Sequence, residues 1–210
     1  MVEQNSIRVG RKKSDKKKEQ ILRAAGELFR EQGFGVSMDM IASKAEVSKQ
    51  TVYSHFSSKG ELFETCIIHQ CEKFQEKLSL EPGSQSPEHS LTAFCFSFQN
   101  MLLNQNAIDM YQTIISQRDA HPDIANAFIE TGPKHKIRLV SEFLSELNAA
   151  GMIKLEQPVE DAAMQLLMMA MGKPVYWAQL GADAGETDEK RYSYIQNCVR
   201  LFLRGCCWKG

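Results

Sequence analysis

The sequence lacks the features that mark several broad classes of protein. Its longest apolar run, near residues 166–171, is much shorter than the roughly 20 residues that a bilayer-spanning helix needs. The first residues are basic and include no apolar segment of the kind found in a signal peptide. We therefore expect no membrane association and a cytoplasmic location.

Signatures of catalytic and metal sites are also missing. The sequence contains no Gly-rich phosphate loop, no GxSxG elbow and no HExxH motif. Its 6 cysteines form no CxxC pair and have no histidine at a ligand spacing, so reduced thiols are expected. The chain is therefore not expected to be an enzyme or to hold a metal or cofactor. The adjacent Cys206 and Cys207 leave a redox role open beside that of an inert chain end.

What the chain does have is ample apolar material and an uneven distribution of charge. Hydrophobic residues make up 43% of its 210 residues, enough for a substantial core. Residues 1–60 carry 12 Lys and Arg against 7 Asp and Glu, whereas residues 61–210 carry 13 against 19. A basic end on an acidic body is typical of a protein that meets a polyanion at one end. Residues 1–15 are expected to form a basic flexible arm.

Apolar residues recur with helical spacing along almost the whole chain, and no alternating strand pattern appears. The apolar stripes lie within residues 21–29, 63–78, 91–102, 108–115, 137–147 and 192–202, and an almost wholly apolar helix covers residues 158–181. Gly172 and Pro174 predict a kink in that helix. Residues 79–87 are expected to form a linker. The sequence therefore predicts an all-α fold.

Two short helices are predicted between residues 37 and 56. Ser37 precedes the first as an N-cap, with Asp39 in its first turn, and Ser48 can cap the second. About three residues join the two helices, which is the spacing of a helix-turn-helix. Val52 is expected to face inward and hold the pair together.

The second of these helices presents polar side chains that suit a DNA duplex. Gln can pair with adenine edges, Lys with guanine or phosphate, and Thr and Tyr with phosphate oxygens. The alternative is that the helix is simply solvated. The residues left to project outward are Lys49, Gln50, Thr51, Tyr53, Ser54 and His55.

The order of residues 28–63, LFREQGFGVSMDMIASKAEVSKQTVYSHFSSKGELF, resembles the N-terminal domain of the tetracycline repressor (TetR) family. The resemblance implies that Ser37 and Met38 lie at the backbone-contacting start of the first short helix, and that Lys59 lies beside the phosphates. It also implies that the recognition helix contains Ser48, Lys49, Gln50, Thr51, Tyr53 and His55. One departure is Glu46, which stands in the turn where the family usually has Gly and must adopt a left-handed conformation at a cost.

The later part of the chain, with HPDIANAF followed by FIETGPKHKIRLVSEFLSELNAAGMI, looks similar to the C-terminal regions of AefR-like members of the family. This similarity implies a ligand cavity among the middle helices and a dimer formed by the last two helices as a four-helix bundle. The expected lining suits an apolar or aromatic effector, although the same residues could simply pack a core. It consists of Phe94, Phe98, Met101, Met110, Tyr111, Ile114, Phe143, Met168, Tyr176 and Trp177.

These observations predict a transcriptional regulator, and specifically a repressor. Residues 16–60 would form the helix-turn-helix DNA-binding domain, and residues 61–210 a helical effector-binding and dimerisation domain. The homodimer would bind double-stranded DNA at a pseudo-palindromic operator until an effector releases it. Two alternatives stay open: an all-α ligand-binding or stress-sensing protein that uses the helix-turn-helix for protein docking, and an α-helical enzyme. DNA binding with a steep salt dependence would separate the first reading from both alternatives.

Overall fold

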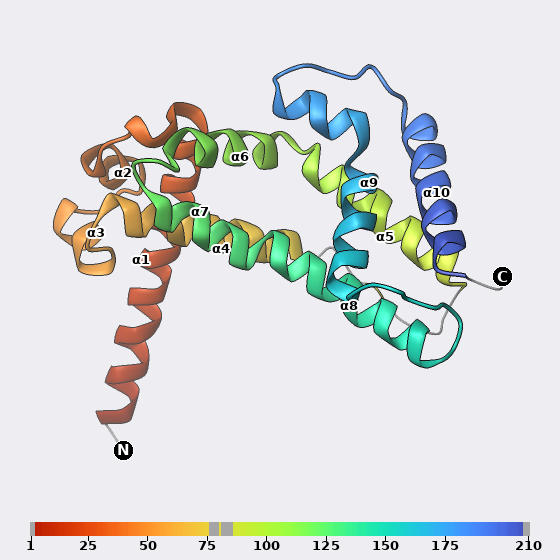
Figure 1. Cartoon of the computed structure of the whole chain (residues 1–210). Helices are drawn as coiled ribbons and strands as arrows, with labels where there is room; N and C mark the ends of the chain where they lie inside the picture. Colours follow the sequence, from red (N-terminus) through yellow and green to blue (C-terminus); the bar gives the residue numbers. More distant parts are fainter. Residues whose placement is uncertain (1–2, 76–79, 81–85, 208–210) are drawn as a thin grey trace. The chain divides into compact units, whose positions relative to one another are not determined.

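The computed structural model describes residues 3–75, Leu80 and residues 86–207, and the side chains of these residues except 3–14 and 74–75. The described residues form helices and no strand, so the predicted all-α fold is confirmed (Figure 1). Leu78 and most of the expected linker at 79–87 lie outside the described residues. The α-helices are α1 (Glu3–Gln32), α2 (Met38–Lys44), α3 (Lys49–His55), α4 (Lys59–Gln75), α5 (Pro87–Leu102), α6 (Gln105–Gln117), α7 (Pro122–Thr131), α8 (Pro133–Ala149), α9 (Val159–Gln179) and α10 (Asp188–Gly205).

The chain divides into two compact units. The N-terminal unit contains Met1–Gln70 and Gln112–Phe128, and the C-terminal unit contains Cys71–Tyr111 and Ile129–Gly210. The N-terminal unit thus includes residues 61–70 and 112–128, which the sequence analysis assigned to the second functional domain. The functional domain boundaries stay a prediction.

In the N-terminal unit, the apolar face of α1 packs against the two short helices that follow. Ile21 and Ala25 of α1 are fully buried, as are Ile41 of α2 and Val52 of α3. Gly33 ends α1 because it takes a φ of 63°, and the one-turn 3-10 helix η1 (Gly33–Gly35) then leads the chain into α2. The predicted inward orientation of Val52 is confirmed.

The C-terminal unit is built on one core to which α5, α8, α9 and α10 contribute. Leu91, Leu144, Leu166, Ile195 and Leu203 are completely buried there. The apolar spacing that predicted these helices from sequence therefore marks the faces that they bury.

The predicted kink in α9 is confirmed at Gly172, where φ is 60° and ψ is −173°. Pro174 has no N–H to donate to the carbonyl of Ala170, and the extended ψ of Gly172 interrupts the helical hydrogen bonds around it. Carbonyl groups near the break therefore need partners from outside α9.

Side chains from α5 and α10 supply these partners. Gln99 of α5 is fully buried, and its Nε2 donates to the carbonyls of Ala170, at 2.9 Å, and Met171, at 3.2 Å. The Tyr194 hydroxyl of α10 donates to the carbonyl of Met169 at 3.0 Å. The break in α9 is thus held by hydrogen bonds from two neighbouring helices.

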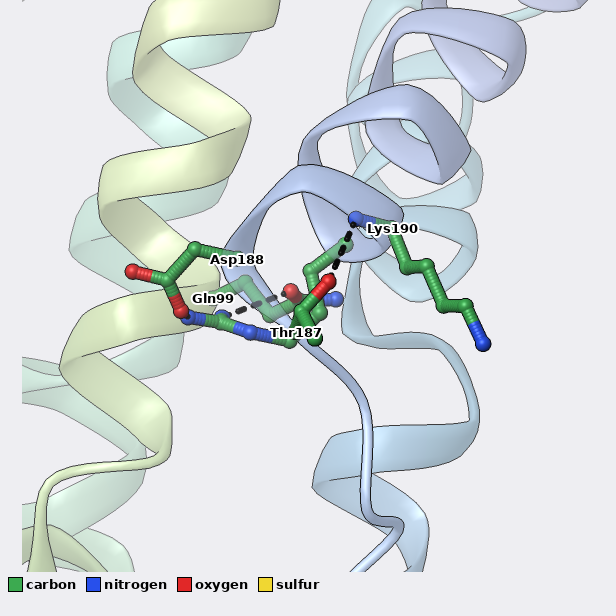
Figure 2. Close-up of polar contacts among 5 residues, drawn as sticks. Gln99, Thr187, Asp188 and Lys190 are labelled. Carbon is green, nitrogen blue, oxygen red and sulfur yellow. Dashed lines mark hydrogen bonds and ion pairs between the residues drawn. The ribbon is translucent and has the colours of Figure 1, made fainter.

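A buried arginine holds Gln99 in this position. Arg191 of α10 donates from Nη1 to Gln99 Oε1 at 3.0 Å, and from Nη2 to Asp188 Oδ1 at 2.7 Å (Figure 2). The guanidinium also lies over the Phe96 ring, 5.2 Å from its centre. Because the oxygen and nitrogen of the Gln99 amide are both bonded, the contact between α5, α9 and α10 is polar but satisfied.

Two elements differ from the sequence-based expectations. The prediction treated the HPD segment as an interruption and missed α7, because Pro122 stands at the first helical position, where proline is favourable. The second difference is that α1 begins at Glu3, so the helix includes most of the expected basic arm. The flexibility of residues 1–15 stays a prediction.

Candidate nucleic-acid interface and effector region

Serine side chains fix the starts of both short helices, as predicted. Ser37 Oγ accepts a hydrogen bond from the N–H of Met40 at 3.2 Å, and Ser48 Oγ accepts one from the N–H of Thr51 at 3.1 Å. Each bond satisfies one of the amide groups that a helix leaves unpaired in its first turn. The two caps therefore define where α2 and α3 begin.

The turn between α2 and α3 is a Schellman motif built around Glu46. The N–H of Val47 donates to the carbonyl of Ala42 at 3.1 Å, and the N–H of Glu46 donates to that of Ser43 at 3.2 Å. This arrangement places Glu46 in the left-handed region with a φ of 52°. The turn thus keeps its geometry with a residue that is less suited to it than Gly.

An ion pair ties the start of α3 to α2. Lys49 Nζ lies 2.8 Å from Asp39 Oδ1, and both side chains are more than half exposed. The hydrogen bond with Asp39 and its negative charge raise the pKa of Lys49, so the ammonium stays protonated. Lys49 would have to exchange Asp39 for a phosphate or base in order to contact DNA.

The remaining predicted DNA-contacting residues of α3 differ in their accessibility. Gln50 is exposed and Tyr53 is 46% exposed, whereas Thr51 and His55 are half-buried. The Thr51 hydroxyl lies 2.8 Å from that of Ser48 and forms part of the cap. Gln50 and Tyr53 are therefore the most accessible candidates beside Lys49, and their contact with DNA stays a prediction.

Two further predicted residues lie at the ends of this region. The Met38 side chain is only 7% exposed, so only its backbone is placed to face a phosphate. Lys59 donates from Nζ to the carbonyl of Phe34 at 2.7 Å, and its ammonium lies 4.3 Å from the centre of the Phe34 ring. Lys59 therefore joins the start of α4 to η1, a contact that the sequence analysis missed.

The first turn of α4 is held by its own serines. The N–H of Glu61 donates to Ser58 Oγ at 3.1 Å, and the Glu61 carboxylate accepts from the N–H and Oγ of Ser57 at 2.7 and 2.6 Å. These hydrogen bonds from Ser57 lower the pKa of Glu61. The N-terminus of α4 is thus ordered beside the helix-turn-helix within the N-terminal unit.

The predicted effector residues fall into three groups. Phe94, Phe98 and Phe143 are at most 7% exposed and share the core of the C-terminal unit, with Met101 packed against it. Met110 and Tyr111 on α6 are half-buried, and the buried Ile114 belongs to the N-terminal unit. In contrast, 51% of Met168, 59% of Tyr176 and 38% of Trp177 are exposed. The structure therefore brings the three phenylalanines together and leaves the three α9 residues on the surface.

Sequence reasoning missed the polar residues inside the C-terminal unit. Gln99, Lys136, Ser141 and Arg191 are all buried, by 91% or more of their surface. For Lys136 a signal existed, because it stands in helical phase with Val140 on the buried face of α8. Charged residues were expected to face solvent, so this spacing was not used.

The cysteines show no metal or disulfide arrangement in the part of the chain that the structure describes. All 6 thiols are free, and no group of three or more His, Cys, Asp and Glu could hold a metal ion among the described residues. Burial raises the pKa of Cys66 and of Cys95 to about 12, which keeps both as thiols. Cys206 is buried and Cys207 is exposed.

A capped helix-turn-helix with an exposed polar second helix, joined to a larger helical unit, is the architecture of a DNA-binding transcriptional regulator. Comparison with protein families agrees. Residues 21–66 match the model of the bacterial regulatory proteins of the tetR family, and residues 89–205 match the C-terminal domain of AefR-like transcriptional repressors. The chain belongs to the TetR family of transcriptional regulators, whose members bind DNA operators, dimerise and bind small-molecule effectors.

Solved structures and a curated relative support this assignment. The flavonoid-responsive regulator FrrA is 32% identical, with a TM-score of 0.82 over 91% of this chain and 97% of its own. A TetR-family regulator from Mesorhizobium loti MAFF303099 is 25% identical, with a TM-score of 0.83 over 91% of this chain and 97% of its own. The HTH-type transcriptional activator FasR of Mycolicibacterium smegmatis is 48% identical over 50 residues, which is 23% of either chain.

The described helices were also compared with the requirements of a membrane span. None of them is both long enough and apolar enough to cross a bilayer.

Proposed function

We propose that this protein is a cytoplasmic transcriptional repressor whose homodimer binds a pseudo-palindromic operator and is released by a small apolar or aromatic effector. The observation that carries the proposal is the helix-turn-helix, with its two serine caps and its exposed α3. Paired α3 helices in successive major grooves would have to be about 34–36 Å apart, a spacing that a two-fold dimer can supply.

Gln50 and Tyr53 are the residues that we assign to the reading of this operator. Both extend from α3 into solvent, and a Gln amide can form two hydrogen bonds with an adenine edge. The Tyr hydroxyl can donate to a phosphate oxygen. Lys49 adds charge close to both residues once it leaves Asp39.

Exposed apolar side chains on α9 and α10 support the dimer. Leu180, Tyr176 and Leu201 are 65%, 59% and 66% exposed, and Met168 is 51% exposed. Large apolar side chains gathered on two helices commonly mark a protein interface. A second copy of this chain would cover them and form the four-helix bundle that the family resemblance implies.

An effector would act by favouring the conformation that cannot bind DNA. A shift from mostly bound to mostly released protein takes about 5.5 kcal/mol of differential affinity. The helix that could transmit this change is α4, because it begins at Lys59 and includes residues of both compact units. The similarity to the flavonoid-responsive regulator FrrA makes flavonoids the first aromatic compounds to screen.

The test begins with selection of bound sequences from a random pool of duplex DNA, followed by titration of the selected operator by fluorescence anisotropy. Gln50→Ala and Tyr53→Ala should each weaken binding by about 1–3 kcal/mol without changing helical content by circular dichroism. Gln112→Ala, an exposed glutamine on α6, is the matched control and should bind like the wild type. Wild-type affinity of both α3 variants would remove this helix from the interface.

A screen for release of the selected operator then tests the effector. Flavonoids and other apolar or aromatic compounds should lower operator affinity. If a broad set of such compounds neither binds the protein nor releases the operator, the apolar effector is excluded while DNA binding stands.

A further inference from the structure

Lys136 on α8 is a lysine buried without a counter-ion. Only 3% of its surface is exposed, so its ammonium does not reach solvent along the side chain in the way that buried lysine stems usually allow. Among the described residues, none of the hydrogen bonds and ion pairs involves its Nζ. Lys134, two residues earlier, is exposed and pairs with Glu130, as lysines on helix surfaces commonly do.

A charge in this position destabilises the protein unless something pairs with it. Removing an ammonium from water without a partner is unfavourable, and native proteins rarely keep such a group without a functional reason. Burial lowers the pKa of Lys136, as expected for a cation that has lost its hydration, and the nearby Cys71 only partly opposes this effect.

The surroundings of Lys136 offer polar groups at one end of an apolar surface. The Cys71 thiol of α4 is close enough to feel the charge of Lys136 and is hydrogen-bonded with Thr131 of α7. Burial nevertheless raises the pKa of Cys71, so this thiol does not supply a thiolate to pair with the ammonium. The ammonium therefore has polar neighbours in the C-terminal unit without a compensating negative charge.

The apolar surface continues from Lys136 along the same face of α8. Val140 and Phe143 follow at helical spacing, and both are buried in the core that contains Phe94 and Phe98. Ser141, on the next turn, is a second unpaired polar group: its buried Oγ is without a hydrogen-bond partner. Two unsatisfied polar groups beside an aromatic cluster are typical of a small-molecule site.

We propose that Lys136 anchors an ionised acidic group, a carboxylate or a phenolate, on an effector whose apolar body packs against Phe94, Phe98 and Phe143. This inference rests on the proposed function, because it specifies the chemical class of the effector. An acidic group would pair with the buried ammonium, whereas an uncharged analogue of the same shape would leave it unpaired. A site of this kind discriminates strongly between the two compounds.

The experiment measures direct binding by isothermal titration calorimetry without DNA, so that its outcome is independent of operator recognition. The probes are two matched pairs, dodecanoate with dodecan-1-ol and apigenin with its trimethyl ether, at a mildly alkaline pH at which the flavone is ionised. Which acid binds distinguishes a carboxylate effector from a phenolate one. The wild type should bind at least one acid about tenfold or more tightly than its neutral partner.

Three variants test the role of Lys136. Lys136→Met keeps the length of the side chain and should abolish the preference for the acid, whereas Lys136→Arg should retain most of it. Lys134→Met removes the exposed neighbouring charge and should retain the full preference. The proposal is overturned if acids and neutral partners bind equally, if neither acid binds, or if Lys136→Met keeps the preference.

Thermal unfolding without added compounds separates this role from a structural one. Removal of an unpaired buried ammonium should raise the melting temperature of Lys136→Met, by about 2–4 °C for each kcal/mol gained in a chain of this length. A lower melting temperature than that of the wild type would show that the ammonium is already paired in the folded protein, and would also overturn the proposal.

Discussion

The break in α9 makes Gly172 a position where a single methyl group should destabilise the C-terminal unit. The φ of 60° and ψ of −173° lie in a region that essentially only Gly adopts, so Ala would add about 1–3 kcal/mol of strain. The new Cβ would also lie 2.7 Å from Tyr194 Cε1, closer than a carbon contact allows. Tyr194 would have to move and lose its hydrogen bond to the carbonyl of Met169, about 0.5–1.5 kcal/mol.

Together these effects predict a loss of about 2–4 kcal/mol for Gly172→Ala. At about 2–4 °C for each kcal/mol in a chain of this size, the melting temperature should fall by roughly 5–15 °C. Differential scanning calorimetry of the purified protein measures this fall.

Gly181→Ala is the matched control for the Gly172 variant. Gly181 also has a positive φ, of 80°, but no atom lies within 4 Å of the position that its Cβ would take. This variant should therefore show only the conformational part of the loss, about 1 kcal/mol. Equal melting temperatures for the two variants would refute the reasoning, because they would show that Tyr194 moves aside without loss.

Three further predictions concern the turn, the DNA-facing ion pair and the dimer. Glu46→Gly should raise the free energy of unfolding by about 1 kcal/mol in urea titrations, because the left-handed φ of 52° suits Gly better; an unchanged value would show that Glu46 is not strained. Asp39→Ala should tighten operator binding at low salt, measured by fluorescence anisotropy, because it frees Lys49 and removes a negative charge beside the phosphates; weaker binding would mean that Asp39 positions Lys49 for DNA. Leu201→Glu, which places a charge on the exposed face of α10, should convert dimers to monomers in sedimentation experiments; an unchanged mass would place the dimer contact elsewhere.

Local signals explain why much of the helical framework could be predicted from the sequence. The caps at Ser37 and Ser48 and the break at Gly172 each depend on residues adjacent in the chain, and all three appear in the structure. The missed helix, α7, begins with Pro122, which ends a helix when it lies inside one but favours a helix when it lies at the start. A local signal with two meanings was therefore misread.

The candidate sites were less predictable because they depend on contacts between distant segments. Gln99 is bonded to Arg191, 92 positions later in the chain, and no spacing rule relates the two. Periodicity alone could not reveal that Lys136 is buried, because a polar residue at the start of a helix is normally solvated. The side chains of α3, in contrast, were predicted as outward-facing because the spacing of a short amphipathic helix determines its two faces.

The hydrogen bonds at the α9 break also bear on the order in which the dimer forms. Gln99, Arg191 and Tyr194 satisfy the break entirely from within one chain, and the core beneath them is buried without a second copy. Nothing in this part of the unit requires a partner to complete it. Dilution below the dimer dissociation constant should therefore give folded monomers, with an unfolding transition that separates from dissociation instead of coinciding with it.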